Sequence, residues 1–316
     1  MYDVTAIGEL LIDFASLSVD EAGYPTMAAY PGGAPCNFLA ALTAYGMKTA
    51  FLGKVGADAF GELLAGTLEK AGIETRGLVR DASVFTTLAF VTFDESGDRR
   101  FSFARKPGAD TCLKFEELDL DMIDNARAFH FGTLSLTDEP VRGTTQKAVA
   151  YARQHGKLIT FDPNLRASLW ADMDEAKEQM LWGLHQADIV KISDEEVDFL
   201  FGCTAEQGAK KLLDEFEVSL AMVTSGPLGC FLMNRNGQIL IPSPTVTVVD
   251  TTGAGDIFGG SAVSRILKTE KAPRDLTVEE MTGIGRFAAT AASLSTQRRG
   301  GIPSILPIEE VEAALN

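Results

Sequence analysis

The sequence predicts an α/β fold in which a central, mostly parallel sheet carries helices on both faces, together with a small β-lid. Three observations lead to this prediction. Short apolar runs alternate with amphipathic segments over most of the 316 residues, as strands and helices do around parallel sheets. The chain is 46% hydrophobic, which suffices for one large core. Residues 86–106 break the alternation and are typical of a strand pair. We expect a single domain over residues 1–316.

The alternation can be followed from one end of the chain to the other. Predicted strands are β-branched, apolar runs, and predicted helices are amphipathic segments, several of which end at glycine. We expect strands over 4–14, 48–56, 127–136, 157–164, 187–193, 219–226 and 245–249, the last leading to Asp250. We expect helices over 36–46, 58–72, 140–156, 174–186, 194–202, 257–267 and 287–297. Strands and helices in this order indicate a mostly parallel sheet.

Two segments interrupt this order. Residues 14–31 are irregular and contain Gly and Pro, and residues 86–106 resemble two strands around a turn at Ser96-Gly97-Asp98. We expect both segments to form a lid over the main sheet. Two ordinary surface insertions are the alternative interpretation.

The composition argues against several classes of protein. A formal net charge of -16 argues against nucleic-acid binding, and it means that a phosphate site needs cations nearby. No apolar run reaches the ~20 residues of a membrane span, and the N-terminus lacks the pattern of a signal peptide. The four cysteines and three histidines are widely spaced, so we expect a reduced, cytoplasmic protein without a zinc site.

The stretch "VVDTTGAGDIFGG", residues 248–260, is the strongest candidate for a site. Gly253 and Gly255 allow a ligand to approach the backbone, and the N–H groups at a helix start suit a negatively charged phosphoryl group. Asp256 would then act as a base that accepts the proton of an attacking hydroxyl. A tight turn with Asp256 as a helix-capping acid is the alternative. The sequence contains no P-loop or dinucleotide fingerprint, which makes a nicotinamide oxidoreductase a remote alternative.

Two distant stretches together resemble one family. "DTTGAGDIFGG" resembles the C-terminal signature of the ribokinase/PfkB-type sugar kinases, and "PGGAPCNFLAALTAYG", residues 31–46, resembles their N-terminal signature. Within that family, "RKPGAD" (105–110), "FHFGTLSL" (129–136) and "FDPNLRASLW" (161–170) are similar to bacterial fructokinases. The resemblance implies a ribokinase-like fold and ATP-dependent phosphorylation of a sugar hydroxyl.

The resemblance also implies roles for individual residues. Asp256 matches the catalytic base, and Gly253, Ala254 and Gly255 match the anion hole. The positions that match sugar contacts are Asp13, Gly32, Gly33 and Asn37. Their chemistry agrees, since a carboxylate after the first strand can accept sugar hydroxyls, and an amide both donates and accepts. A helix N-cap is the alternative for Asn37.

Two arginines and one aromatic residue are expected at the substrate. Arg105, on the lid hairpin, would reach the substrate on closure, and Arg166 follows a strand at the carboxyl edge where α/β ligands bind. Surface ion pairs are the alternative for both. Phe103 on the lid lacks a hydroxyl that would help to bind a carboxylate, which favours a neutral sugar.

The remaining positions concern the nucleotide and metal ions. "KISDEEVDFL" resembles the Asn-x-x-Glu segment of the family, with Glu196 near Mg²⁺ through water and Ser193 in place of the asparagine. The residues expected to line the nucleotide are Lys191, Ser193, Thr224, Gly226 and Gly229, and the helix over 287–297 offers a small-residue surface to adenine. Asp250, Thr252, Gly300 and Ser304 resemble a monovalent-cation loop, which suggests K⁺.

These observations predict an enzyme that converts ATP and fructose to ADP and fructose 6-phosphate. A 2-keto-3-deoxygluconate kinase, or another sugar or nucleoside kinase of the family, is the nearest alternative. A non-catalytic sugar sensor on the same fold is an alternative of a different class. A lid with exposed sheet edges would gain from pairing with a second copy, so we expect a homodimer.

Overall fold

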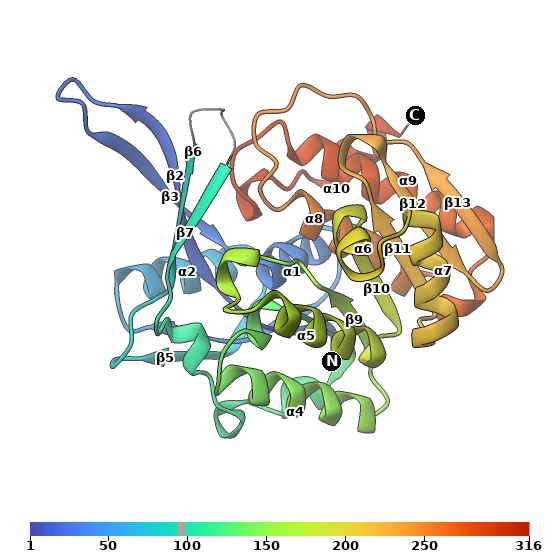
Figure 1. Cartoon of the computed structure of the whole chain (residues 1–316), viewed down its shortest axis with the longest axis horizontal. Helices are drawn as coiled ribbons and strands as arrows, with labels where there is room; N and C mark the ends of the chain where they lie inside the picture. The colour runs from blue at the N-terminus through green and yellow to red at the C-terminus, as the bar shows by residue number, and fades with distance from the viewer. Residues whose placement is uncertain (94–98, 316) are drawn as a thin grey trace.

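The computed structural model describes residues 1–93 and 99–315 (Figure 1), and a nine-stranded sheet forms its centre. Within the described residues the strand order is β13 (Gly237–Ile241), β12 (Cys230–Asn234), β11 (Leu220–Thr224), β10 (Ile189–Ser193), β9 (Leu158–Asp162), β8 (Ala126–Gly132), β1 (Tyr2–Ile7), β4 (Thr49–Gly56) and β5 (Glu74–Asp81). All neighbours are parallel except at one edge, where β12 pairs antiparallel with both β11 and β13. The mostly parallel sheet is therefore confirmed.

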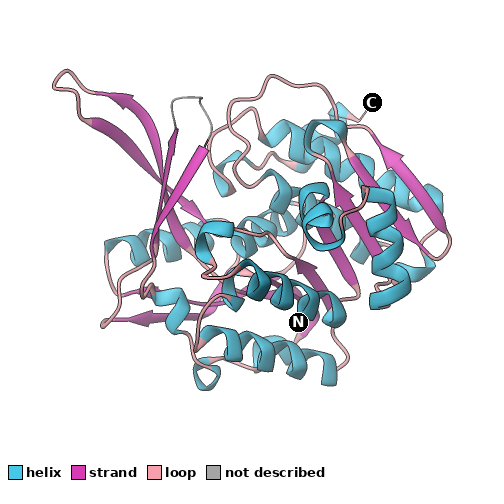
Figure 2. Cartoon of the chain, in the orientation of Figure 1, coloured by secondary structure: helices cyan, strands magenta, loops and turns pink. Residues whose placement is uncertain are grey.

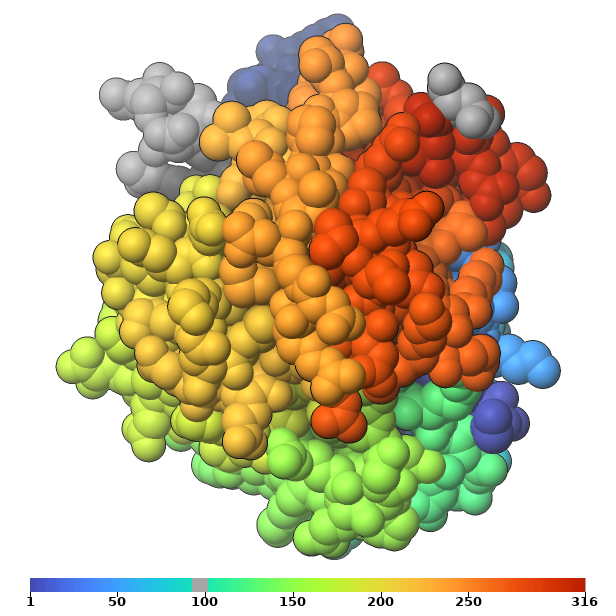
Figure 3. Space-filling model, turned by 90° about the vertical axis from the view of Figure 1, so that its right-hand side faces the viewer, coloured from blue at the N-terminus to red at the C-terminus, as the bar shows by residue number. Residues whose placement is uncertain are grey.

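Helices cover both faces of this sheet (Figure 2), as predicted. On one face α4 (Val141–Gln154), α5 (Met173–Gln186), α6 (Asp194–Phe201) and α7 (Ala205–Phe216) share a core cluster with the central strands. The other face is covered by α1 (Ala34–Ala44), α2 (Ala59–Lys70), α8 (Ala254–Lys268) and α9 (Val278–Ser295). The short helices α3 (Asp121–Asp124) and α10 (Ile308–Ala314) complete the set described. Figure 3 looks onto the β13 edge, where the C-terminal third of the chain forms much of the surface.

A second, four-stranded sheet stands at one side of the molecule (Figure 1). It consists of β3 (Pro25–Gly32), β2 (Leu11–Val19), β6 (Leu88–Phe93) and β7 (Arg99–Ala104) in that order. The β2–β3 and β6–β7 pairs are antiparallel, whereas β2 and β6 run parallel. We call it the small sheet. Both interrupting segments thus enter one sheet, and the predicted turn at 96–98 lies outside the described residues.

The predicted strand over 4–14 is wrong in extent. The chain leaves the main sheet after Ile7 and enters the small sheet at Leu11, so one apolar run serves two sheets. Gly8 makes the break possible, because its φ is 156° and a Cβ there would lie 2.6 Å from Cγ of Pro35 in α1. Apolar periodicity alone does not reveal this change of sheet.

The predicted strand over 245–249 is also wrong. These residues form no strand; Val248 and Val249 are more than half exposed, and the Val249 N–H donates to the Thr296 carbonyl at the end of α9. With no neighbouring strand to pair with, the β-branched side chains do not impose a strand. No described helix is long and apolar enough to cross a bilayer.

Candidate active site

Asp256 lies in the first turn of α8, beside the carboxyl ends of the central strands, and its carboxylate is held by two amides. Asn37 Nδ2 donates to Asp256 Oδ2 at 2.9 Å, and Asn164 Nδ2 donates to Asp256 Oδ1 at 3.1 Å. Burial raises the pKa of Asp256, while the Asn37 hydrogen bond and the charges of Lys191 and Arg166 oppose that rise. The carboxylate therefore has a fixed orientation and an increased affinity for a proton.

The glycine turn before Asp256 leaves no room for a side chain at Gly253 or Gly255. Gly253 is the N-cap of α8 with φ 76°, and a Cβ there would lie 2.9 Å from the Cα of Gly301. A Cβ at Gly255 would lie 2.9 Å from Lys191 Nζ. Among the described contacts the N–H groups of Gly253 and Gly255 have no acceptor, whereas the Ala254 N–H donates to the Thr251 carbonyl at 3.2 Å. The two glycines fit the predicted anion hole better than Ala254 does.

Asp13 follows β1 but lies within the next strand, β2 of the small sheet, opposite Tyr30. Its side chain occupies the space over Gly32, where a Cβ would collide with the Asp13 carboxylate. Burial raises the pKa of Asp13 to about 7, the charge of Arg166 lowers it, and Asp256 and Asp250 raise it. These interactions bring Asp13 and Asp256 into one electrostatic site, as the sequence predicts.

Gly33 and Asn37 begin α1 on the other side of the site. Gly33 is the N-cap of this helix with φ 120°, and a Cβ there would collide with the Glu9 carbonyl. Asn37 therefore lies within the first turns of the helix and is not its N-cap, so its side chain is free to hold Asp256.

The loop after β9 brings Asn164 and Arg166 to the site. Asn164 has φ 47°, in the left-handed region that asparagine tolerates, and this conformation presents its amide to Asp256. Arg166 is half-buried, and among the described residues its guanidinium forms no ion pair; Nη1 donates to the Leu165 carbonyl at 3.3 Å. Its charge lowers the pKa of both Asp13 and Asp256. Arg166 is thus a cation of the site that no carboxylate of the described residues pairs with.

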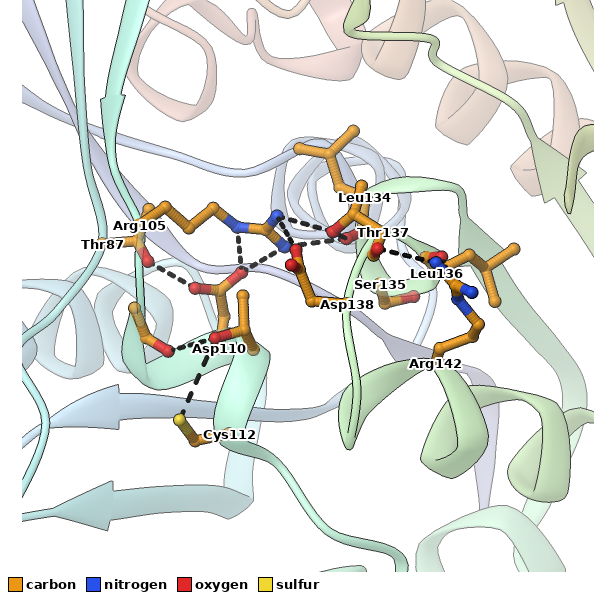
Figure 4. Close-up of polar contacts among 12 residues, drawn as sticks. Thr87, Arg105, Asp110, Cys112, Leu134, Ser135, Leu136, Thr137, Asp138 and Arg142 are labelled. Carbon is orange, nitrogen blue, oxygen red and sulfur yellow. Dashed lines mark hydrogen bonds and ion pairs between the residues drawn. The ribbon is translucent and has the colours of Figure 1, made fainter. Parts of the chain in front are cut away.

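Arg105 departs from the prediction, because its guanidinium is buried and already bound (Figure 4). Nε and Nη2 both lie 2.8 Å from Asp110 Oδ2, and Nη1 and Nη2 each donate at 2.7 Å, to Thr137 Oγ1 and the Leu134 carbonyl. Asp110 also accepts from the Thr87 hydroxyl. Arg105 therefore anchors the base of the β6–β7 strand pair and is not a free cation on an exposed lid. Phe103, half-buried on β7 opposite Ala89, does belong to the small sheet.

The residues predicted to line a nucleotide meet in one cavity of about 600 Å³, which we call the large cavity. Its lining includes Lys191, Ser193, Thr224, Gly226 and Gly229. The small side chains of Ala289, Ala292 and Ser293 on α9 line it as well, where the sequence predicts a flat surface for adenine. Thr251, Ala254 and Gly255 form the wall toward Asp256.

A second cavity of about 230 Å³, the small cavity, lies on the small-sheet side of the same turn. Asp13, Tyr30, Asp250, Thr252 and Gly300 are among the residues that line it. Residues 250 and 252 thus face the small cavity, while residues 251, 254 and 255 face the large cavity. The glycine turn separates a pocket rich in carboxylates and hydroxyls from one with a small-residue wall.

Glu196 is a buried structural carboxylate. With Ser193 it forms a capping box of α6, in which Oε2 accepts from the Ser193 N–H at 2.8 Å, while Oε1 accepts from the Leu165 N–H at 2.7 Å. Each oxygen keeps a further lone pair, which fits Mg²⁺ held through water but not by a cage of protein ligands. No group of three potential acidic, His or Cys ligands occurs among the described residues.

The structure brings together most of the predicted cation loop. Asp250 Oδ1 accepts from the Thr252 N–H and hydroxyl at 3.0 and 2.8 Å, and Oδ2 accepts from the Gly300 N–H at 2.9 Å. The Ser304 hydroxyl instead donates to the Gly301 carbonyl at 2.7 Å. A cation in this loop would therefore rely on carbonyl oxygens more than on these side chains.

Two residues of the site, one buried and one half-buried, were missed by the sequence analysis. Asn164 and Asp162 both stand in "FDPN", of which only the following arginine was used. Asp162 ends β9 and forms an ion pair with Lys191, at 3.1 Å between Oδ2 and Nζ. An acid and an amide around a proline at a strand end were a usable signal, because parallel strands deliver such residues to the binding edge.

The family is settled by the match along the chain. Residues 1–309 match the model of the pfkB family carbohydrate kinases. The chain belongs to this family. It is therefore a carbohydrate kinase, an enzyme that transfers a phosphoryl group to a hydroxyl group, and the predicted ribokinase-like α/β fold is confirmed.

Relatives of this pfkB kinase include fructokinases. The chain is 40% identical to fructokinase-1 of Zea mays over 311 residues, which covers 97% of this chain and 95% of the relative. A fructokinase from Xylella fastidiosa with bound ATP superposes with a TM-score of 0.91 and is 29% identical, with 99% and 98% of the two chains covered. A double-mutant fructokinase from Vibrio cholerae O395, with fructose, ADP and potassium ion bound, gives a TM-score of 0.88 at 28% identity, over 100% and 99% of the chains.

Proposed function

We propose that this kinase transfers the γ-phosphoryl group of ATP to the 6-hydroxyl group of fructose. The observation that carries the proposal is the glycine turn, which stands between the two cavities with Asp256 held by two amides behind it. Sugar in the small cavity and nucleotide in the large cavity would meet at this turn. The fructokinase relatives support fructose as the acceptor.

Residues of the chain itself bind the sugar, take the proton and stabilise the transferred group. Asp13 accepts hydrogen bonds from sugar hydroxyls, and Asp256 accepts the proton of the attacking hydroxyl. The sugar oxygen then forms a bond to the γ-phosphorus, while the bond from phosphorus to the bridging oxygen breaks and ADP leaves with the electron pair. The N–H groups of Gly253 and Gly255 stabilise the charge on the transferred group.

Two metal ions are part of the proposal. Mg²⁺ would be held by nucleotide phosphates and by waters near Glu196, and it would neutralise phosphate charge when bound. K⁺ would bind in the loop of Asp250, Thr252 and Gly300, which Asp250 already closes by its hydrogen bonds. The potassium-bound fructokinase supports this second site.

A neutral sugar is favoured over a sugar acid by the arginines. A 2-keto-3-deoxygluconate kinase would need cations for its carboxylate substrate, but Asp110 already neutralises Arg105. Only Arg166 remains among the two predicted arginines, and Asp13 and Asp256 lie close to it. The intact base and glycine turn disfavour a non-catalytic sensor.

The small sheet would act as a lid and as a dimer contact. Closure over Asp13 would exclude water and so limit ATP hydrolysis without sugar. The β2–β3 hairpin exposes Leu17, Val19 and Tyr24, which a second copy would cover in a cytoplasmic homodimer. Light scattering at several concentrations tests the dimer.

A screen of ADP release with fructose, ribose, 2-keto-3-deoxygluconate and nucleosides tests the function. We expect fructose to give the highest kcat/KM, with the phosphate on O6 by NMR. Comparable or faster turnover of the sugar acid would reject the proposed substrate. Nucleotide binding without turnover of any acceptor would reject catalysis itself.

A further inference from the structure

One buried ion pair lies beside the reaction centre and takes no part in the steps above. Lys191 stands near the carboxyl end of β10, and its Nζ lies 3.1 Å from Asp162 Oδ2 at the end of β9. The two residues are only 8% and 6% exposed. Burial of an ion pair carries a desolvation cost that its attraction does not always offset. A role in the reaction would explain why this pair is retained here.

The ammonium group of Lys191 lies against the anion hole. A Cβ on Gly255 would be 2.9 Å from Nζ, so the lysine occupies the space beside that glycine. Lys191 also lines the large cavity together with Ala254 and Gly255. It is the one charged side chain among the described residues that line this cavity. A nucleotide there would meet this lysine at the wall nearest Asp256.

Four titratable side chains from four elements surround Lys191: Asp162 on β9, Glu196 on α6, Asp256 on α8 and His130 on β8. Burial lowers the pKa of Lys191, but the three carboxylates outweigh this and raise it. Burial, helped by the charge of Lys191, lowers the pKa of His130 to about 3. Lys191 is therefore a permanent cation at neutral pH, with a neutral histidine behind it.

We propose that Lys191 contacts the γ-phosphoryl group during its transfer, and that Asp162 is the positioning residue that holds Lys191 in place. This rests on the proposed function. As the bond from phosphorus to the sugar oxygen forms and the bond to the bridging oxygen breaks, negative charge grows on the leaving oxygen. The ammonium group beside Gly255 offsets that charge, while the hydroxyl proton passes to Asp256 and Lys191 keeps its own protons.

Lys191→Met tests the contact. We expect kcat to fall by ~10²–10³-fold, as for loss of one anion-hole donor, with the Kd for fructose unchanged in calorimetry. The preference of the protein for ATP over ADP should disappear, because only ATP carries the γ-phosphoryl group. Lys210→Met, an exposed lysine on α7 paired with Asp214, is the matched control and should change neither value.

Asp162→Asn tests the positioning role. Loss of this carboxylate lowers the pKa of Lys191, so the alkaline limb of kcat should move to lower pH, which a purely structural defect would not produce. The double variant Lys191→Met/Asp162→Asn removes both buried charges. It provides a folded comparison if Lys191→Met alone is unstable, and its kcat should stay low.

Retention of kcat within about threefold in a folded Lys191→Met or double variant would overturn the inference, as would an unshifted alkaline limb in Asp162→Asn. The ATP-over-ADP preference is measured without any sugar. It therefore tests the role of Lys191 even if no sugar is turned over. Absence of turnover would reject the proposed function but would leave the Lys191 contact to be judged by nucleotide binding.

Discussion

The Asn164 amide donates to Asp256 Oδ1 at 3.1 Å from a left-handed backbone position, opposite the Asn37 amide on Oδ2. Each oxygen of the carboxylate thus has its own amide, one from the loop after β9 and one from α1. A base oriented in this way keeps a lone pair directed at the substrate with little reorganisation.

Asp256→Asn should reduce kcat by ~10²–10⁴-fold, since the variant has no base. Fructose binding should persist, because Asp13 is untouched. Steady-state kinetics and calorimetry measure the two effects. Near wild-type turnover by a folded variant would mean that another group takes the proton.

Asn164→Ala should lower kcat more than it raises the KM of fructose, because the amide orients the base. Asn164→Gly keeps the backbone conformation available and separates its effect from that of the amide. If both variants keep full kcat, the amide has no part in orienting Asp256. Asn236→Ala, at an exposed turn on the β12–β13 hairpin, is the control and should leave kcat unchanged.

The KM for fructose should rise as the pH falls below about 7, because burial raises the pKa of Asp13 to about 7 and the neutral acid is a poorer acceptor. Asp13→Asn should flatten this profile and raise KM at pH 8. A wild-type KM that stays constant between pH 5.5 and 8 would contradict the assignment.

The same pKa has a consequence for stability. Folded Asp13 binds its proton more tightly than unfolded Asp13, whose pKa is near 3.8. Its contribution to stability is therefore present below about pH 4 and is lost as the pH rises to about 7. Asp13→Asn should raise Tm at pH 8 more than at pH 5, as scanning calorimetry can measure.

Gly253→Ala should abolish most activity, because the new Cβ would lie 2.9 Å from the Gly301 backbone and φ is 76°. Gly156→Ala is the matched control, since its φ is 67° but nothing lies within 4 Å of its Cβ. Both changes should cost about 1 kcal/mol of backbone strain, and only the first should affect kcat. Equal kinetics for the two would remove the glycine turn from the reaction.

The two arginines should respond differently to removal. Arg105→Met leaves Asp110 buried without its ion-pair partner and should lower the free energy of unfolding by about 3–5 kcal/mol. The double variant Arg105→Met/Asp110→Asn should regain part of this stability, because it removes the unpaired carboxylate as well. Arg166→Met should keep stability and lower kcat/KM, as urea unfolding and kinetics would show. A stable Arg105→Met with impaired sugar binding would restore Arg105 to the site.

The sequence analysis could predict the candidate site because its parts lie in two compact stretches. Residues 31–46 and 250–260 placed Asn37 and Asp256 in one site, and the structure joins them by a hydrogen bond. The predicted nucleotide residues also meet in the large cavity, since Lys191, Ser193 and Thr224 lie on β10 and β11, and Gly226 and Gly229 follow β11 at the same sheet edge.

What escaped prediction depends on tertiary partners. Arg105 was expected to be free although Asp110 stands five residues later in the same motif, because sequence does not show whether two such charges meet. The run over 4–14 conceals its change of sheet, since both halves are equally apolar. The run over 245–249 has strand composition but no neighbouring strand with which to pair.

The change of sheet between Ile7 and Leu11 has a mechanical consequence. The residues between them are buried, and Glu9 caps α1 by accepting from the Ala34 N–H at 2.7 Å, so the joint is stiff. Asp13 lies two residues beyond Leu11, on the strand that this joint supports. Any tilt of the small sheet would therefore move Asp13, the proposed sugar ligand, with it. Because such coupling is reciprocal, a sugar bound to Asp13 would in turn shift the orientation of the small sheet, so that sugar binding and lid position would depend on each other.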